Sequence, residues 1–184
     1  MINRWDPSHL GRIDRLVSID EDARVLEVGC GQGHLTKALA NRGLDILGVD
    51  ANPRAAEVAG TDLVSHMRAE ALEFDDETFD VILSVHAIEH IPALEEALAE
   101  MARVLKPGGT AVHIYPAEPI KGLYAIPTSI ILHGTPFKAR EVHCHKLWPS
   151  KLRGLMEPLG MTQTATEFSL LMSPQFASVF EKTG

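Results

Sequence analysis

Short apolar runs alternate along the chain with longer segments in which apolar residues recur every three or four positions. The runs that have the length of buried strands are 25–28, 46–49, 64–68, 79–85 and 111–115. The intervening segments with the periodicity of amphipathic helices are 34–42, 53–59 and 94–105. Strands that alternate with helices predict an α/β fold, in which helices pack on the faces of a parallel sheet.

The two ends of the chain extend this pattern. Residues 1–22 predict a leading helix, and residues 150–160 predict a last helix with Ser150 as its N-cap. Two further segments, 164–171 and 176–181, predict strands that complete the sheet.

Composition and charge narrow the class of protein. The chain has 184 residues with 17 basic and 25 acidic side chains, which give a net charge of −8. Its length fits one domain, 1–184, and its negative charge argues against a nucleic-acid partner and against an anionic membrane surface. No apolar run approaches the roughly 20 residues of a membrane span, and the amino terminus has no signal-peptide pattern. The two cysteines, Cys30 and Cys144, fit free thiols in a cytoplasmic protein.

The residues between 24 and 50 carry the clearest chemical pattern. An apolar run leads into V-G-C-G-Q-G, with Gly29, Gly31 and Gly33 at alternate positions, and a second apolar run ends in Asp50. Glycine takes positive φ and lets the backbone approach a ligand, and the helix that follows directs its free amide groups at the turn. An acid at the end of the second strand can accept both hydroxyls of a ribose. This order of elements predicts a nucleotide-binding half-fold.

The glycine spacing and Glu27 distinguish between nucleotide cofactors. Dinucleotide-binding turns have G-x-G-x-x-G, whereas this turn has G-x-G-x-G preceded by Glu27. A carboxylate is a poor neighbour for a pyrophosphate but a good one for a ligand that carries an ammonium and a sulfonium group. The run from Val25 to Gly33, followed by Asp50, resembles the first motif of the class I S-adenosylmethionine-dependent methyltransferases, of the small-molecule, methyltransferase domain 11-like type.

This resemblance implies a Rossmann-like fold. Its sheet is doubly wound and seven-stranded, mostly parallel with an antiparallel last strand, and has helices on both faces. The implied cofactor is S-adenosyl-L-methionine, with its methionine ammonium group near Glu27 and its ribose on Asp50. The residues expected around the cofactor are Glu27, Gly29, Cys30, Gly31, Gly33, Leu35, Asp50, Ala51, Glu70, Ala71, Ser84, Val85 and His86. The acid-alanine pair that flanks adenine in the family matches Glu70-Ala71, or Arg68-Ala69 if the match is shifted.

Two later segments bear on the methyl acceptor. The sequence H-A-I-E-H-I-P at 86–92 resembles a family motif that Glu89 and His90 match. Residues 117–147 contain several prolines with apolar patches between them, and the resemblance places a substrate cap between the fifth strand and the last helix. Long segments of this kind are often functional, and the apolar patches favour a packed, partly helical cap.

Four histidines are candidates for a catalytic base: His86, His90, His143 and His145. Histidine suits this role because it titrates near neutral pH. His86 follows the strand that opens onto the transferable methyl group, although that position often only lines the cofactor. His90 matches a histidine that is common in the family and that fits a role in bracing the loop. His143 and His145 could reach the acceptor or form a polar strand edge, and we expect no metal because no further acid or cysteine completes a site.

The sequence therefore predicts transfer of a methyl group to a small-molecule acceptor, through an oxygen, nitrogen or carbon nucleophile. An alternative is a binding module that keeps the cofactor pocket but lacks turnover. An NAD-dependent oxidoreductase is disfavoured by the glycine spacing and by Glu27. Nothing in residues 117–147 matches a pattern specific for one acceptor, and nothing in the chain specifies an oligomeric state.

Overall fold

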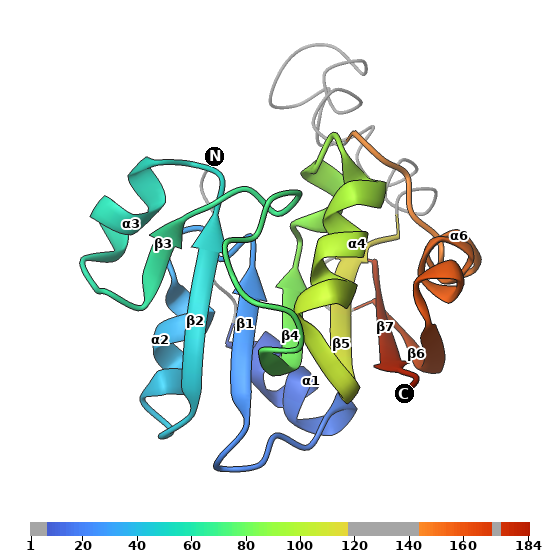
Figure 1. Cartoon of the computed structure of the whole chain (residues 1–184), viewed down its shortest axis with the longest axis horizontal. Coiled ribbons are helices and arrows are strands. Elements are labelled where there is room, and N and C mark those ends of the chain that lie inside the picture. The colour runs from blue at the N-terminus through green and yellow to red at the C-terminus, as the bar shows by residue number, and fades with distance from the viewer. Residues whose placement is uncertain (1–6, 118–143, 171–173) are drawn as a thin grey trace.

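The computed structural model describes residues 7–117, 144–170 and 174–184. These residues form a seven-stranded sheet with the order β3-β2-β1-β4-β5-β7-β6 (Figure 1). The strands are β1 (Arg24–Val28), β2 (Asp45–Asp50), β3 (Val64–His66), β4 (Phe79–Val85), β5 (Leu105–Pro116), β6 (Met161–Ser169) and β7 (Gln175–Lys182). Neighbouring strands from β3 to β5 are parallel, and β7 is antiparallel to both β5 and β6. The predicted sheet, mostly parallel with an antiparallel last strand, is confirmed.

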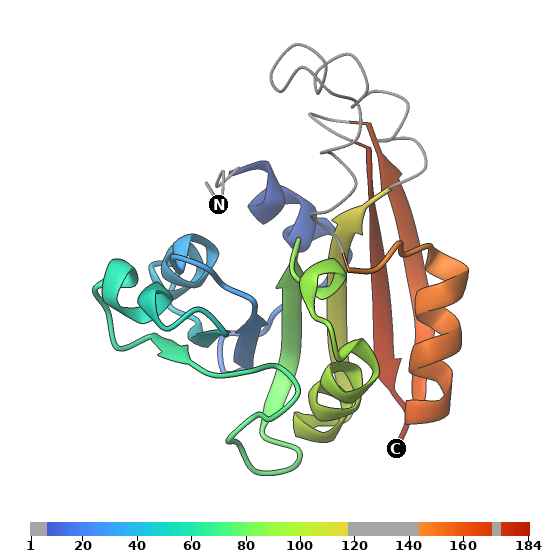
Figure 2. The same ribbon diagram turned by 90° about the horizontal axis from the view of Figure 1, so that it is seen from above.

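Helices cover both faces of this sheet (Figures 1 and 2). The helices are α1 (Ser8–Leu16), α2 (His34–Ala40), α3 (Arg54–Ala59), α4 (Leu94–Val104) and α6 (Pro149–Met156). α1 and α2 lie on one face, where Ile13 and Leu39 belong to the same core cluster as Val81 of β4. α4 and α6 lie on the other face, where Leu98 and Met156 belong to a cluster with Ile82. Successive residues of β4 therefore serve opposite cores, which explains its unbroken apolar run.

The leading helix and the third strand are shorter in the structure than predicted. α1 ends at Leu16, because Val17 has extended backbone angles (φ −144°, ψ 133°). Residues 17–22 are therefore not helical, contrary to the predicted helix over 1–22. β3 ends at His66 and does not reach Arg68.

The last helix begins differently from the prediction. Trp148 is the N-cap of α6 and Pro149 is its first residue, so the prediction of Ser150 as N-cap is wrong. Proline favours the first helical position because its φ is already helical and the amide it lacks would have no partner within the helix. A short 3-10 helix, η3 (Glu157–Leu159), follows α6 before Gly160 ends the element with a left-handed backbone.

Two strands begin earlier than predicted. β5 starts at Leu105, which pairs with Phe79, and the pairing then shifts before it resumes at Val81 and Thr110. This path passes so close to β4 that a Cβ on Gly109 would lie 2.9 Å from the carbonyl oxygen of Asp80. The sequence pattern for this strand begins only at 111 because the preceding lysine, proline and glycines do not look like a strand. β6 likewise starts at Met161, where the pattern predicts 164.

The predicted substrate cap, 117–147, is only partly among the described residues, because 118–143 lie outside them. At one end of this segment, the amide of Ala117 donates to the carbonyl of Pro174, 2.9 Å away. At the other end, Leu147 is buried in the core cluster that includes α4 and α6. In the described parts of the chain, no helix has the length and hydropathy needed to cross a bilayer.

Candidate active site

The glycine turn between β1 and α2 is shaped by close packing against neighbouring loops. Gly29, Gly31 and Gly33 all have left-handed backbones, with φ values of 77°, 53° and 68°. A Cβ on Gly29 would lie 2.2 Å from the Cβ of Ala87, and one on Gly33 would lie 2.5 Å from Cγ2 of Val64. Gly29 and Gly33 are therefore required both by backbone angle and by space, whereas Gly31 is favoured by its backbone angle, and Gly29 brings the turn against Ala87, which follows β4.

Asp50 joins the end of β2 to this turn. Its Oδ2 accepts a hydrogen bond from the amide of Gly31, and its Oδ1 accepts one from the amide of Asn52, both at 2.8 Å. Each carboxylate oxygen has a second lone pair, so the same group can also accept a pair of sugar hydroxyls. Asp50 thus holds the turn in shape and remains half-buried at the predicted ribose position.

Glu27 lies below the turn with 4% of its surface exposed. Its Oε2 accepts a hydrogen bond of 2.5 Å from the hydroxyl of Thr36 on α2. Burial raises the pKa of Glu27 to about 7; hydrogen bonds from Thr36 oppose this shift, and the charge of Asp50 adds a smaller contribution to it. Burial and the same two carboxylates also raise the pKa of the Cys30 thiol. Among the described residues neither Glu27 nor Asp50 has a Lys, Arg or His within ion-pair distance, so the turn is strongly electronegative.

His86 follows β4 directly and lies beside the glycine turn. Its φ of 53° is unusual for a residue other than glycine, and its amide donates to the carbonyl of Ile114 at 2.8 Å. Ring atom Nε2 lies 2.9 Å from Oε1 of Gln175, the first residue of β7. Nδ1 lies 3.5 Å from Oε1 of Glu89, and the ring meets His9 of α1 edge-on with centroids 5.6 Å apart. His86 therefore meets groups from three separate parts of the chain.

Glu89 is the buried acid of this cluster. It lies in the short 3-10 helix η1 (Ile88–His90) and is 1% exposed. Neither of its carboxylate oxygens receives a hydrogen bond from the described residues. Its nearest cationic candidates are Nδ1 of His86 at 3.5 Å and Nε2 of His90 at 3.9 Å. A buried carboxylate without hydrogen bonds is costly, which makes this position a functional candidate.

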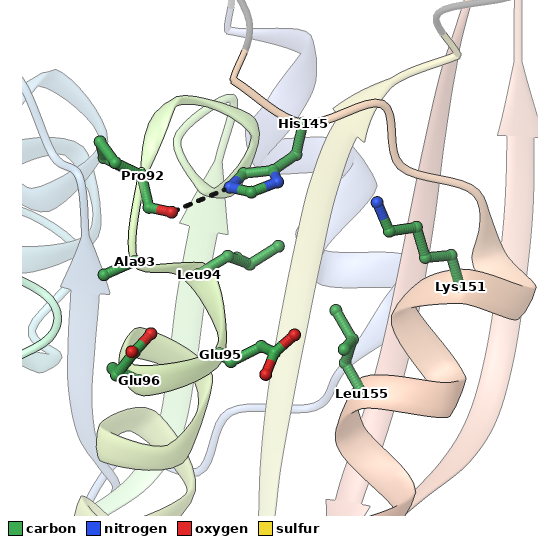
Figure 3. Close-up of a pocket in the computed structure, with 8 residues that line it drawn as sticks. All are labelled: Pro92, Ala93, Leu94, Glu95, Glu96, His145, Lys151 and Leu155. Atoms are coloured by element: carbon green, nitrogen blue, oxygen red, sulfur yellow. Dashed lines mark hydrogen bonds between the residues drawn. The ribbon is translucent and has the colours of Figure 1, made fainter.

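His145 has a different environment from His86. Its Nε2 donates to the carbonyls of Ile91, at 2.9 Å, and Pro92, at 3.3 Å, and its amide donates to the carbonyl of Glu89 at 3.1 Å. These bonds hold the segment after η1. The ring lines a hollow of about 540 Å³ between α4 and α6 (Figure 3). The geometry therefore gives His145 a bracing contact, and its predicted role as a base stays a prediction.

The remaining predicted residues differ widely in exposure. Cys30, Leu35 and Ser84 are buried, Val85 is half-buried, and Ala51 and Ala71 are exposed. Glu70 forms an ion pair with Arg68, while Ala69 packs in the core, so both adenine placements remain predictions. His143 lies outside the described residues, and within them no three His, Cys, Asp or Glu side chains form a group that could hold a metal ion.

Sequence analysis did not identify Gln175 as a site residue. It is 7% exposed and is separated from its partner His86 by 89 positions. The only local signal is a polar residue at the start of an apolar strand. The position of Gln175 near His86 depends on the antiparallel direction of β7. This direction puts the first residue of β7 opposite Pro116, the last residue of β5.

Comparisons with known proteins agree with this geometry. Residues 26–113 match a family model described as a methyltransferase domain. A ubiquinone biosynthesis O-methyltransferase from Chelativorans sp. is 34% identical over 110 residues, which cover 55% of this chain and 44% of that protein. An uncharacterized methyltransferase from Mycobacterium leprae is 39% identical over 97 residues, which cover 50% of this chain and 36% of that protein. The chain thus matches less than half of the length of these curated relatives.

One solved structure is similar to this chain over nearly its whole length. A S-adenosylmethionine-dependent methyltransferase from Methanosarcina mazei has a TM-score of 0.76, covering 97% of this chain and 98% of that one. The sequence identity is 19%, so this likeness shows a shared fold.

Proposed function

We propose that this chain, whose residues 26–113 match a methyltransferase domain, belongs to the class I S-adenosylmethionine-dependent methyltransferases and transfers a methyl group from S-adenosyl-L-methionine to a small-molecule acceptor. The observation that carries the proposal is the electronegative glycine turn. Two carboxylates, Glu27 and Asp50, lie there without a cation from the described residues, and the adjacent backbone has the shape that only glycines allow. A ligand with an ammonium group, a sulfonium group and a ribose complements these features.

The residues present fit this cofactor. Asp50 already accepts two amide hydrogen bonds and has lone pairs left for the ribose hydroxyls. Glu27 is buried beneath the turn, where a nearby ammonium group would favour its ionised form. The pyrophosphate of a dinucleotide in the same position would instead bring negative charge towards two carboxylates. This repulsion favours the sulfonium cofactor over a dinucleotide.

The chemistry needs little from the protein beyond alignment. When bound, S-adenosyl-L-methionine supplies an electrophilic methyl group, which leaves its sulfur as the acceptor atom bonds to it. The chain would position the acceptor in line, exclude water and accept any proton that the acceptor loses. His86 is the proposed base, which is supported by its side chain being 29% exposed and by the packing of its neighbour Ala87 against Gly29 of the turn.

The acceptor is proposed to be a small molecule. The net charge of −8 disfavours a nucleic acid. The similarity to the O-methyltransferase from Chelativorans sp. supports an oxygen nucleophile as the first class to test. A panel of phenols, catechols and primary amines would cover the plausible nucleophiles.

Calorimetry and product detection test this proposal together. The full chain should bind S-adenosylhomocysteine, and incubation with S-adenosyl-L-methionine and a suitable acceptor should release S-adenosylhomocysteine. Binding of NADH in place of S-adenosylhomocysteine would overturn the proposal. Binding without turnover across the whole panel would favour a module that holds the cofactor but does not react.

A further inference from the structure

We infer that Glu89 and Gln175 are positioning residues that set which nitrogen of His86 carries the proton, so that Nε2 faces the acceptor as the base. The inference rests on the proposed methyl transfer and deepens it. Its direct structural basis is the pair of contacts on opposite sides of one imidazole, with Nδ1 3.5 Å from Glu89 and Nε2 2.9 Å from Gln175.

The backbone fixes where this imidazole lies. His86 has a left-handed φ of 53°, which costs energy for a side chain other than glycine. Its amide bonds to Ile114 of β5, and the next residue, Ala87, packs against Gly29 of the cofactor turn. Strained backbone of this kind occurs at functional sites, where the surrounding structure holds it in place. The ring is thus presented at the end of β4 beside the cofactor turn.

Glu89 determines the state of Nδ1. A carboxylate can only accept hydrogen bonds, so the nitrogen that faces it is stable when it carries hydrogen. Glu89 is 1% exposed and receives no hydrogen bond from the described residues, which leaves it dependent on the histidine nitrogens beside it. The separation of 3.5 Å is longer than a hydrogen bond, and such contacts commonly tighten when substrate binds. The neutral ring is therefore protonated on Nδ1 and has its lone pair on Nε2.

Gln175 occupies the position in front of that lone pair. Its carboxamide places an oxygen 2.9 Å from Nε2, and a half-turn of the same group places its NH₂ there instead. The NH₂ orientation matches an unprotonated Nε2. Gln175 is 7% exposed and is held in the sheet opposite Pro116 and Ser169, so its side chain has a restricted range. An acceptor O–H or N–H group would replace this NH₂ as the donor to Nε2.

Other titratable groups also lie near the ring. His9 of α1 meets it edge-on, with centroids 5.6 Å apart. Nε2 of His90 lies 3.9 Å from the same Glu89 oxygen that faces His86, so His90 shares the charge of that carboxylate. Neither contact occupies Nε2 of His86, which Gln175 alone bonds among the described residues.

This arrangement selects a class of acceptor. The nucleophilic atom carries both a lone pair and an exchangeable proton, as in a phenol, an alcohol or a neutral amine. The acceptor lone pair forms the bond to carbon, the carbon–sulfur electron pair goes to sulfur, and the released proton passes to Nε2. His86 then carries two N–H groups, and Glu89 stabilises the resulting imidazolium.

Nitrogen NMR of the histidine rings tests the inference without an acceptor. The full chain is labelled with ¹⁵N-histidine and saturated with S-adenosylhomocysteine, and His86 is assigned by loss of its signals in His86→Asn. In the wild type, the neutral ring should carry its proton on Nδ1. Glu89→Gln should move a large share of the population to the Nε2–H form. Gln175→Glu replaces a possible donor by a carboxylate, so in this variant, unlike the wild type, Nε2 should carry hydrogen as well as Nδ1.

Matched controls separate this effect from a loss of structure. Gln163→Glu on β6 and Glu96→Gln on α4 make the same chemical changes away from His86 and should leave its signals unchanged. A wild-type ring protonated on Nε2 would overturn the inference, as would unchanged His86 signals in a folded Gln175→Glu or Glu89→Gln chain. Calorimetry with S-adenosylhomocysteine on the same samples tests the proposed function separately. If no binding is detected, the proposed cofactor is contradicted, whereas the inferred protonation of His86 on Nδ1 is not.

Discussion

The candidate active site has a proposed cofactor side at the glycine turn and a proposed acceptor side around His86, and the two are built in different ways. On the cofactor side, Glu27, the glycine turn and Asp50 lie within a single stretch of sequence, and Asp50 bonds directly back to Gly31. On the acceptor side, His86 meets Gln175 from the last strand and His9 from the first helix. The cofactor side is therefore fixed by one supersecondary unit, whereas the acceptor side depends on the assembly of the whole sheet.

Two buried ionisable groups of the chain, Glu27 beneath the glycine turn and His113 in β5, offer a second contrast. Glu27, beneath the cofactor turn, is an acid whose pKa burial raises to about 7. His113, in the middle of β5, is a base whose pKa burial lowers to about 4. Both groups resist ionisation in the folded chain, but they respond to pH in opposite directions. Substitutions at the two sites should therefore separate their contributions to stability.

The largest effect is expected for Gly29→Ala. The new Cβ would overlap Ala87 at 2.2 Å, and the backbone has a φ of 77°. We expect a loss of about 3 kcal/mol or more in the free energy of unfolding, because overpacking and backbone strain combine. Gly60→Ala is the matched control, since its φ is 63° but no heavy atom lies within 4 Å of the new Cβ. In urea denaturation, Gly60→Ala should lower the free energy of unfolding by only about 1–2 kcal/mol. Equal losses in the two variants would show that the close contact between Gly29 and Ala87 does not matter for stability.

Glu27→Gln should remove a pH dependence of stability. The folded pKa of about 7 lies above the ordinary value of 4.5, so the unfolded chain loses this proton first as the pH rises. The contribution of Glu27 is complete below pH 4.5 and is lost as the pH approaches 7, with a total of about 3 kcal/mol. Denaturation of wild type and Glu27→Gln across this range measures the difference. The same pH profile for both chains would contradict the assignment, and the exposed Glu96→Gln serves as control.

His113→Leu should act in the opposite pH range. The ring of His113 is fully buried, and neither nitrogen has a hydrogen-bond partner among the described residues. The folded pKa of His113, about 4, lies below the ordinary 6.5. The contribution of the neutral ring to the free energy of unfolding is therefore complete above pH 6.5 and is lost as the pH falls towards 4. The lost stability is about 3 kcal/mol in wild type. The leucine variant should lack this loss and should be at least as stable at pH 7, whereas a destabilised variant with an unchanged acid profile would refute the prediction.

A smaller effect, on binding, is expected for Asp50→Ala. The variant loses an acceptor for the ribose and also frees the amides of Gly31 and Asn52. We expect affinity for S-adenosylhomocysteine to fall by about 1–3 kcal/mol in calorimetry, the range for a lost charged hydrogen bond. Asp50→Asn should lose less, because its remaining oxygen can still accept from one amide. Unchanged affinity in Asp50→Ala would remove this residue from the cofactor site, and the exposed Asp62→Ala is the control.

The contrast between the two sides explains how much the sequence could predict. The glycine turn and the acid Asp50 at the end of the second strand follow from local spacing, because each depends on residues close in the chain. Gln175 could not be found in this way, since its role depends on which strand lies beside β5 and in which direction it runs. The N-cap of α6 was misplaced for a local reason: Ser150 and Pro149 are both good starting residues, and the proline takes the first helical position.

The reversed direction of β7 has a consequence for how acceptor preference could change. In the parallel strands, ligand-facing residues follow the strand, so a change in them alters a loop. In β7 the proposed positioning residue, Gln175, opens the strand after the connection from β6. Adding or removing one residue in that connection could slide the strand by one position and turn Gln175 to the opposite face of the sheet. A change in the length of the β6–β7 connection would thus alter acceptor preference without changing the proposed methyl-donor contacts at the glycine turn.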